Sequence, residues 1–403
     1  MNQDAPPHGT AAKVSGDQRM VRQHNLAAVA RLVRSGTGHT RRDVGELLNL
    51  NKVTVSSLVG ELIDRGLLEQ NVPDDARGVG RPSAVLSVDE TRHLAIVVEL
   101  LPSTVTVTTW SLSLSERSSR TIAISPTELG PARTISRVAT ELRRTLARAD
   151  DSGQQVVGVV VALPGVIESD AGHVRLSGPL GWHDVALRDR LMARVGAECP
   201  PVRIERAANM ATVAEWRNLP GCSSLIYLDE GSAGLGVGVV VEDRLLSGHR
   251  GRAGELLFSS SNLAAKFRLD DLGLDALLRR TDNGTDFIGA SPTSTAKPAS
   301  STPAIGQALT AKTRAAVDRL AESVADYLST LVALLDPELV LLGGHFTTLA
   351  PHLGPTLRRS LDARLSRVWQ TEIPIHFGVY GPRAARLGAA TVAADQEFGR
   401  LSN

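Results

Sequence analysis

From His93 onward, the chain alternates between short apolar runs and longer segments with helical periodicity. The apolar runs are rich in Val, Ile and Leu, as strands covered on both faces usually are; they span 94–101, 105–114, 156–163, 202–205, 224–229, 338–344 and 373–379. Helical segments lie between them, at 130–149, 206–217, 308–335, 347–367 and 383–396. This alternation predicts an α/β fold. The pattern repeats in outline after a hairpin at 234–248, so we expect two α/β lobes.

The segment before His93 has a different pattern. Apolar residues at helical spacing predict helices over 19–33, from Thr40, and over 52–65. Thr40 begins the sequence T-R-R-D, which resembles a capping box with Asp in place of Glu. Two strand-like runs follow and are joined by the polar loop PDDARGVGRP; they lie at 67–72 and 83–88. Three helices and a hairpin predict a winged helix-turn-helix over residues 18–88.

The net positive charge of the chain lies in this first region. The whole sequence carries 44 Lys and Arg against 43 Asp and Glu, whereas residues 18–85 carry ten basic and seven acidic residues. The second helix of a helix-turn-helix reaches base edges with its N-terminal residues, and the backbone is gripped around it. We therefore predict a DNA-binding surface that includes Thr40, Arg41, Arg42, Asn51, Lys52, Thr54, Val55, Ser56, Ser57, Arg77 and Arg81.

Arg77 and Arg81 lie in the expected wing tip, where an extended arm suits a narrow minor groove. The alternative is that the three-helix unit mediates protein contacts and that its arginines are ordinary solvated charge. The agreement of helix spacing, cap, wing and local charge favours DNA.

Other features of the composition limit the class of protein. Cys199 and Cys222 match neither a metal-ligand spacing nor a disulfide framework, which favours a reducing compartment. The sequence contains no apolar run long enough for a membrane span and no secretory signal. We expect a cytoplasmic protein without a membrane partner. Residues 1–17 are expected to form a disordered tail, and residues 281–304 a mobile surface loop.

Seven stretches of the sequence, taken with their order and spacing, resemble the ROK family, which is named for repressors, open reading frames and kinases. The resemblance is to its transcription-regulator branch in particular. They lie at 22–36, 61–70, 78–89, 162–187, 228–256, 334–344 and 385–393. The resemblance implies a winged helix followed by two lobes of the actin-like, RNase H-like sugar-kinase fold, with ligand between the lobes. The lobes would span 89–203 and 204–382, with the helix at 383–400 returning to the first lobe.

The chain departs from the family's sugar kinases at the residues that carry their chemistry. The resemblance implies a Glu-Asn-Asp-Ala-Asn motif whose Asp is the general base, but residues 205–209 read Glu-Arg-Ala-Ala-Asn. Ala207 cannot accept a proton, so we expect that the chain has no kinase activity and is not an enzyme. The first phosphate loop, residues 98–104, contains no glycine, so we expect no nucleotide cofactor. Phe258 stands at the family's zinc-binding His, and no cysteine follows it, so we expect no metal.

The resemblance places the remnants of a ligand pocket at Gly165, Arg206, Asn209 and Glu255. Arg206 is either a new contact for an anion or a salt bridge that fills an abandoned pocket. The glycine-rich stretch LDEGSAGLGVGVVV, at 228–241, is interpreted as a retained strand turn and hinge that no longer holds phosphates.

The resemblance therefore favours a transcription regulator, a repressor more readily than an activator. Its partners would be a roughly palindromic double-stranded DNA operator and a second copy of the chain, in a homodimer or homotetramer. A small-molecule effector would be a sugar or a sugar derivative. Two alternatives stay open: a sugar kinase with an attached DNA-binding head, and an effector-independent DNA-binding protein with a vestigial pocket.

Overall fold

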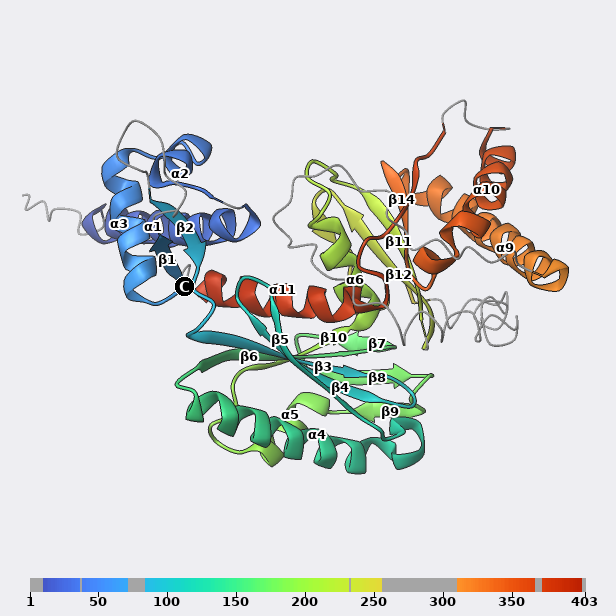
Figure 1. Ribbon diagram of the computed structural model, residues 1–403, viewed down its shortest axis with the longest axis horizontal. Helices are drawn as coiled ribbons and strands as arrows, with labels where there is room; N and C mark the ends of the chain where they lie inside the picture. Colours follow the sequence, from blue (N-terminus) through green and yellow to red (C-terminus); the bar gives the residue numbers. More distant parts are fainter. Residues whose placement is uncertain are drawn as a thin grey trace, which may run out of the picture.

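The computed structural model describes residues 10–36, 38–71, 84–231, 233–255, 310–366 and 372–400. Figure 1 shows an N-terminal head and two lobes, with one long C-terminal helix running between the lobes toward the head. The two predicted segments at 281–304 and 73–82 lie outside the described residues. No described helix is long and apolar enough to span a membrane.

The head consists of three helices and a two-stranded antiparallel sheet. The elements are α1 (Thr10–Ser35), α2 (Arg41–Leu47), α3 (Lys52–Asp64), β1 (Leu68–Asn71) and β2 (Val85–Val88). One apolar face of each helix meets the others in a shared core that includes Leu26, Val29, Val33, Val44, Leu58, Leu62 and Leu86. Helix α1 begins at Thr10 rather than near Gln18, so the backbone of residues 10–17 is helical and not the tail we expected.

The first lobe is built on a five-stranded sheet in the order β10-β6-β3-β4-β5. Its strands are β3 (His93–Leu100), β4 (Val105–Ser111), β5 (Glu116–Ile122), β6 (Gln155–Leu163) and β10 (Val202–Arg206). Alternate residues of β3 point to opposite faces, because side chains along a strand alternate. Ile96 and Val98 face the core beneath α4 (Pro126–Asp151) and α5 (Leu187–Val195). Ala95 and Val97 share a core with α11 (Ala384–Arg400).

Several elements of this lobe were not expected from the sequence. The run at 105–114 is a strand and a turn rather than one strand, and β5 follows it. A small antiparallel sheet also lies between β6 and α5; its strands are β7 (Val166–Glu168), β8 (His173–Ser177) and β9 (Trp182–Val185). The sequence indicated helix α4 only from residue 130, and a kink at Gly130, with φ of 69°, marks that position.

The second lobe has a sheet in the order β13-β12-β11-β14-β15. Its strands are β11 (Leu225–Gly231), β12 (Gly234–Val241), β13 (Arg244–Leu245), β14 (Leu339–Gly344) and β15 (Ile375–Phe377). Helices α9 (Ala311–Leu335) and α10 (Phe346–Leu365) share one core with this sheet. Helix α6 (Ala207–Trp216) lies between the lobes and contacts β12 and α11 (Figure 1). The 3-10 turn η1 (Gly381–Arg383) leads into α11.

Candidate functional site

The pair α2–α3 forms the first candidate surface, and capping side chains fix its geometry. The Thr40 hydroxyl accepts from the backbone N–H of Asp43 (3.3 Å), while the Asp43 carboxylate accepts from the backbone N–H of Thr40 (2.7 Å). The expected capping box is therefore confirmed. Asn51 caps α3 by accepting from the backbone N–H of Thr54 (2.9 Å). A Cβ on Gly45 would lie 3.0 Å from the Leu50 carbonyl oxygen, so this glycine lets the turn approach α2 closely.

The first turn of α3 presents a largely exposed face. Asn51, Lys52, Ser56 and Ser57 are exposed, and Thr54 is half-buried. Val55 was predicted to belong to this surface, but it is buried in the head's core, because it lies on the face of α3 that packs against the other helices. The exposed apolar residue is Val53 instead, at 80% exposed.

The arginines at the start of α2 differ in their surroundings. Arg41 donates to the Gln70 side-chain oxygen (2.9 Å) and to the Ser56 carbonyl oxygen (3.1 Å), so it joins α2 to α3 and β1. The side chain of Arg42 is 84% exposed and pairs only with Glu46 on its own helix in the described part of the chain. Arg42 is therefore the more accessible of the two. The predicted wing residues Arg77 and Arg81 lie outside the described residues.

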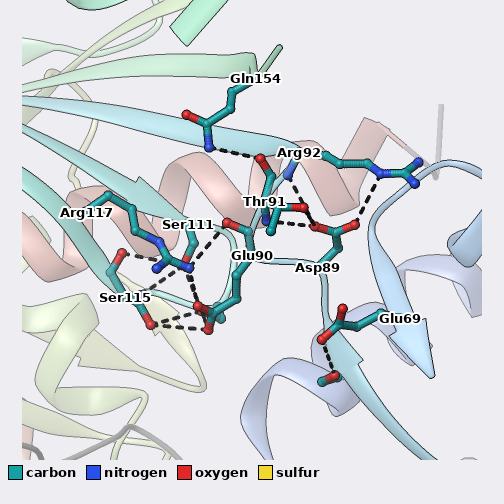
Figure 2. Close-up of polar contacts among 11 residues, drawn as sticks. Glu69, Asp89, Glu90, Thr91, Arg92, Ser111, Ser115, Arg117 and Gln154 are labelled. Atoms are coloured by element: carbon teal, nitrogen blue, oxygen red, sulfur yellow. Dashed lines mark hydrogen bonds and ion pairs between the residues drawn. The ribbon is translucent and has the colours of Figure 1, made fainter. Parts of the chain in front are cut away.

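The link between the head and the first lobe is fastened by polar contacts, as Figure 2 shows. The Asp89 carboxylate accepts from the backbone N–H of Thr91 (2.7 Å), which holds a tight turn after β2. Glu90 pairs with Arg117 of β5, and the Gln154 amide donates to the Thr91 carbonyl oxygen (2.9 Å). The connection is a braced turn, so rotation of the head about this point is restricted.

The second candidate site lies at the start of α6, where the sequence predicted a ligand pocket. Arg206 is only 4% exposed, and it donates to the Asn209 side-chain oxygen (2.6 Å) and to the Val237 carbonyl oxygen of β12. Burial lowers the pKa of its guanidinium, and the charge of Glu255 opposes that shift. Arg206 thus lies beside Asn209 and near Glu255, and its Nε and one terminal nitrogen donate to acceptors of the protein itself.

Residues near Arg206 also bond to other groups of the protein. The Glu205 carboxylate accepts from Arg203 (2.5 Å) and from the Ser169 hydroxyl (2.8 Å). Gly165 has φ of 125°, and a Cβ there would lie 2.3 Å from the Leu176 carbonyl oxygen of β8. Its lack of a side chain is explained by packing between β7 and β8. Trp182, in the same family stretch, is buried and donates to the Pro126 carbonyl oxygen (3.3 Å).

The glycine-rich stretch at 228–241 forms the hairpin of β11 and β12. Two of its glycines are required by helix packing rather than by a phosphate. A Cβ on Gly236 would lie 2.6 Å from Cβ of Ala208, and one on Gly238 would lie 1.7 Å from the Thr212 hydroxyl oxygen, both on α6. Small residues at these positions let β12 and α6 approach closely. The stretch is a structural contact between α6 and the second lobe.

Acidic side chains gather beside this hairpin. Desolvation raises the pKa of Asp229 to about 7, and the charges of Glu99 and Glu215 add to the rise, while a hydrogen bond from the Tyr227 hydroxyl opposes it. Glu99 pairs with Arg386 of α11 (2.7 Å), and Glu215 accepts from the backbone N–H groups of Val379 and Tyr380. In the part of the chain that the structure describes, no cluster of His, Cys, Asp and Glu could hold a metal ion.

The raised pKa of Asp229 predicts a pH dependence of stability. The unfolded carboxyl ionises near its ordinary pKa of 3.8, so this group's contribution is fully present below that pH and is lost as the pH rises to about 7. Between pH 5 and pH 8 the wild-type chain should lose about 3 kcal/mol more stability than Asp229→Asn. Urea unfolding of both proteins at the two pH values measures this difference. Equal losses in both proteins would contradict it.

The sheets and their covering helices define a two-lobed α/β protein of the sugar-kinase-like class, preceded by a three-helix head. The sequence model of the ROK family matches residues 124–257. A solved ROK family transcriptional regulator, a homologue of the Escherichia coli MLC protein, aligns with 95% of this chain and 98% of its own, with a TM-score of 0.68 at 18% identity. The ROK hexokinase from Thermus thermophilus aligns with 75% of this chain and 98% of its own, with a TM-score of 0.53 at 25% identity.

Sequence relatives include two regulators. The xylose repressor of Caldicellulosiruptor bescii is 26% identical over 253 residues, which are 61% of this chain and 61% of the repressor. The DNA-binding transcriptional dual regulator NagC of Escherichia coli strain K12 is 27% identical over 246 residues, which are 60% of this chain and 58% of NagC. The chain thus spans about three fifths of the length of these relatives.

Proposed function

We propose that this chain is a DNA-binding transcriptional regulator of the ROK type that acts as a repressor. The observation that carries the proposal is the exposed first turn of α3, which the capped α2–α3 pair holds away from the head's core. That is the arrangement by which a helix-turn-helix inserts its second helix into the major groove. The two relatives named as regulators support the same activity.

The proposal extends to the partners. Helix-turn-helix heads recognise paired half-sites when the protein is symmetric. We therefore propose a cytoplasmic homodimer or homotetramer that binds a roughly palindromic operator, with residues 18–88 as a winged helix-turn-helix. In this proposal the two lobes assemble the oligomer, and lobe movement changes the spacing of the heads.

Selection of genomic DNA fragments by the purified full chain tests this function. The recovered sequence is then labelled, and its affinity is compared with that of a scrambled duplex of the same composition. Specific sites are expected to bind about 10³-fold or more tightly than non-specific DNA at physiological salt. Equal affinity for both duplexes would refute the proposal. Analytical ultracentrifugation of the complex reports how many chains bind one site.

The residues at the start of α6 support a regulator rather than a kinase. Ala207 is the first residue of α6 and offers no proton acceptor, and Arg206 fills the space beside it with a positive charge. Of the two roles open for Arg206, its bonds to Asn209 and Val237 favour filling an abandoned pocket over contacting an anion. A neutral sugar would have to displace these bonds.

We therefore expect no sugar-dependent hydrolysis of ATP by the purified chain. Loss of a general base alone costs about 10²–10⁴-fold in rate. A coupled assay for ADP over a panel of hexoses measures this, with a ROK-family glucokinase assayed in parallel as the positive control. ADP formation that rises with hexose concentration would favour the alternative of a kinase with an attached head.

A further inference from the structure

Asp395 lies near the end of α11, and its carboxylate contacts both the N-terminal head and the residue that follows α6. One of its oxygens accepts from Arg34 of α1, at 2.5 Å. The other accepts from Arg217, the residue that follows α6, at 3.2 Å. Arg31 of α1 also approaches, with 4.0 Å between its Nε and the carboxylate. One side chain thus connects the head to a helix that lies between the lobes.

The head's side of this contact is buried and incompletely bonded. The Arg34 side chain is 9% exposed, and its guanidinium lies over the ring of Phe398, with 5.2 Å to the ring centroid. One terminal nitrogen of Arg34 is buried without a hydrogen-bond acceptor among the described residues. A buried donor without a partner costs free energy, whereas an arginine and a carboxylate can form two parallel bonds. Arg34 therefore makes one bond to Asp395 where two parallel bonds would satisfy both of its terminal nitrogens.

On the side of the lobes, α6 connects this contact to Arg206. Helix α6 begins at the Arg206 and Asn209 pair and ends beside Arg217. An open recess of about 490 Å³ adjoins Asp395; Arg203, Val392, Gln396, Gly399 and Arg400 also line it. The braced turn of Figure 2 also ties the head to the first lobe.

We propose that Asp395 is a positioning residue that couples lobe movement to the head, because Arg217 and Arg34 compete for its carboxylate. When α6 draws Arg217 away, Asp395 turns and accepts both terminal N–H groups of Arg34, which fixes α1 more tightly. When Arg217 engages, Arg34 keeps one hydrogen bond to Asp395, and α1 is held less tightly. Asp395 thus has two discrete bonding arrangements, and movement of α6 or of the head changes which of the two is favoured. The consequence for DNA rests on the proposed function, but the coupling itself does not.

The test compares Arg217→Ala with Asp395→Asn in the full chain. Amide hydrogen exchange in residues 26–35 of α1 reports how tightly the head is held. Competition predicts opposite effects: about threefold slower exchange in Arg217→Ala, and about tenfold faster exchange in Asp395→Asn. A merely structural network would give faster exchange in both. Arg217 is 54% exposed, so its alanine variant leaves the core intact.

Arg383→Ala is the matched control, because Arg383 also pairs with one carboxylate at 3.2 Å, that of Glu116, and is 48% exposed. This control should leave exchange in α1 unchanged. Exchange shifts of the same sign in Arg217→Ala and Asp395→Asn, or an equal shift in Arg383→Ala, would overturn the proposal. The dissociation constants for DNA should likewise move in opposite directions. Opposite exchange shifts in a chain that binds no DNA would support the coupling and refute the proposed function.

Discussion

Lys52→Glu is expected to weaken specific DNA binding by about 10- to 100-fold, the loss that follows from removing one contact at the centre of the interface. Lys52 is the first residue of α3 and is exposed. Reversing its charge replaces attraction to a phosphate with repulsion. A glutamate in the first turn of a helix is favoured by the helix dipole, so the head should remain folded. Fluorescence anisotropy with a labelled operator measures the change, and the salt dependence of binding should become shallower.

Lys312→Glu provides a closely matched control. Lys312 is exposed in the first turn of α9, so the variant makes the same charge change in the same helical context, but in the second lobe. Its dissociation constant for the operator should change by less than about twofold, since charges far from bound DNA are screened. Equal weakening by both variants would point to the net charge of the chain rather than to α3. Unchanged binding by Lys52→Glu would remove α3 from the interface.

Features of the head that depend on neighbouring residues could be predicted from the sequence. The Thr40 and Asp43 capping box joins residues three apart, and apolar spacing located all three helices to within a few residues except at the start of α1. The sequence did not indicate that Arg41 would bond to Gln70, 29 residues away. Val53 was missed as an exposed residue, although it lies outside the apolar spacing of Val55, Leu58 and Leu62.

The lobes show the same limit. Long apolar strands such as β3 and β6 were recognised because both faces of the sheet are covered, whereas β7, β8 and β9 are short and only partly buried, so their composition gives a weak signal. The glycines at 236 and 238 were interpreted as part of a retained strand turn and hinge, but only the position of α6 explains them. The contact between Arg34 and Asp395 spans 361 residues, and local pattern carries no information about such a pair.

Gly388→Ala should destabilise the chain by about 3 kcal/mol, near the upper end for overpacking a well-filled interior. A Cβ at this position of α11 would lie 1.7 Å from the Met210 carbonyl oxygen and 3.2 Å from the Ala214 backbone nitrogen. Both atoms are backbone of α6, so no side chain can turn aside. Helices α6 and α11 would have to separate. The connection from Arg206 through α6 to Asp395 on α11 depends on this contact.

Gly399→Ala in the same helix separates packing from helix propensity. Alanine is favoured over glycine within a helix by up to about 1 kcal/mol, and a Cβ at this position would meet only the Arg31 guanidinium, at 4.0 Å. Gly399→Ala should therefore be neutral or slightly stabilising, so the two variants are expected to differ in sign. Urea unfolding followed by tryptophan fluorescence compares them directly. If Gly388→Ala unfolds at the wild-type midpoint, α6 and α11 are not in close backbone contact, and movement of α6 has no rigid route to the head.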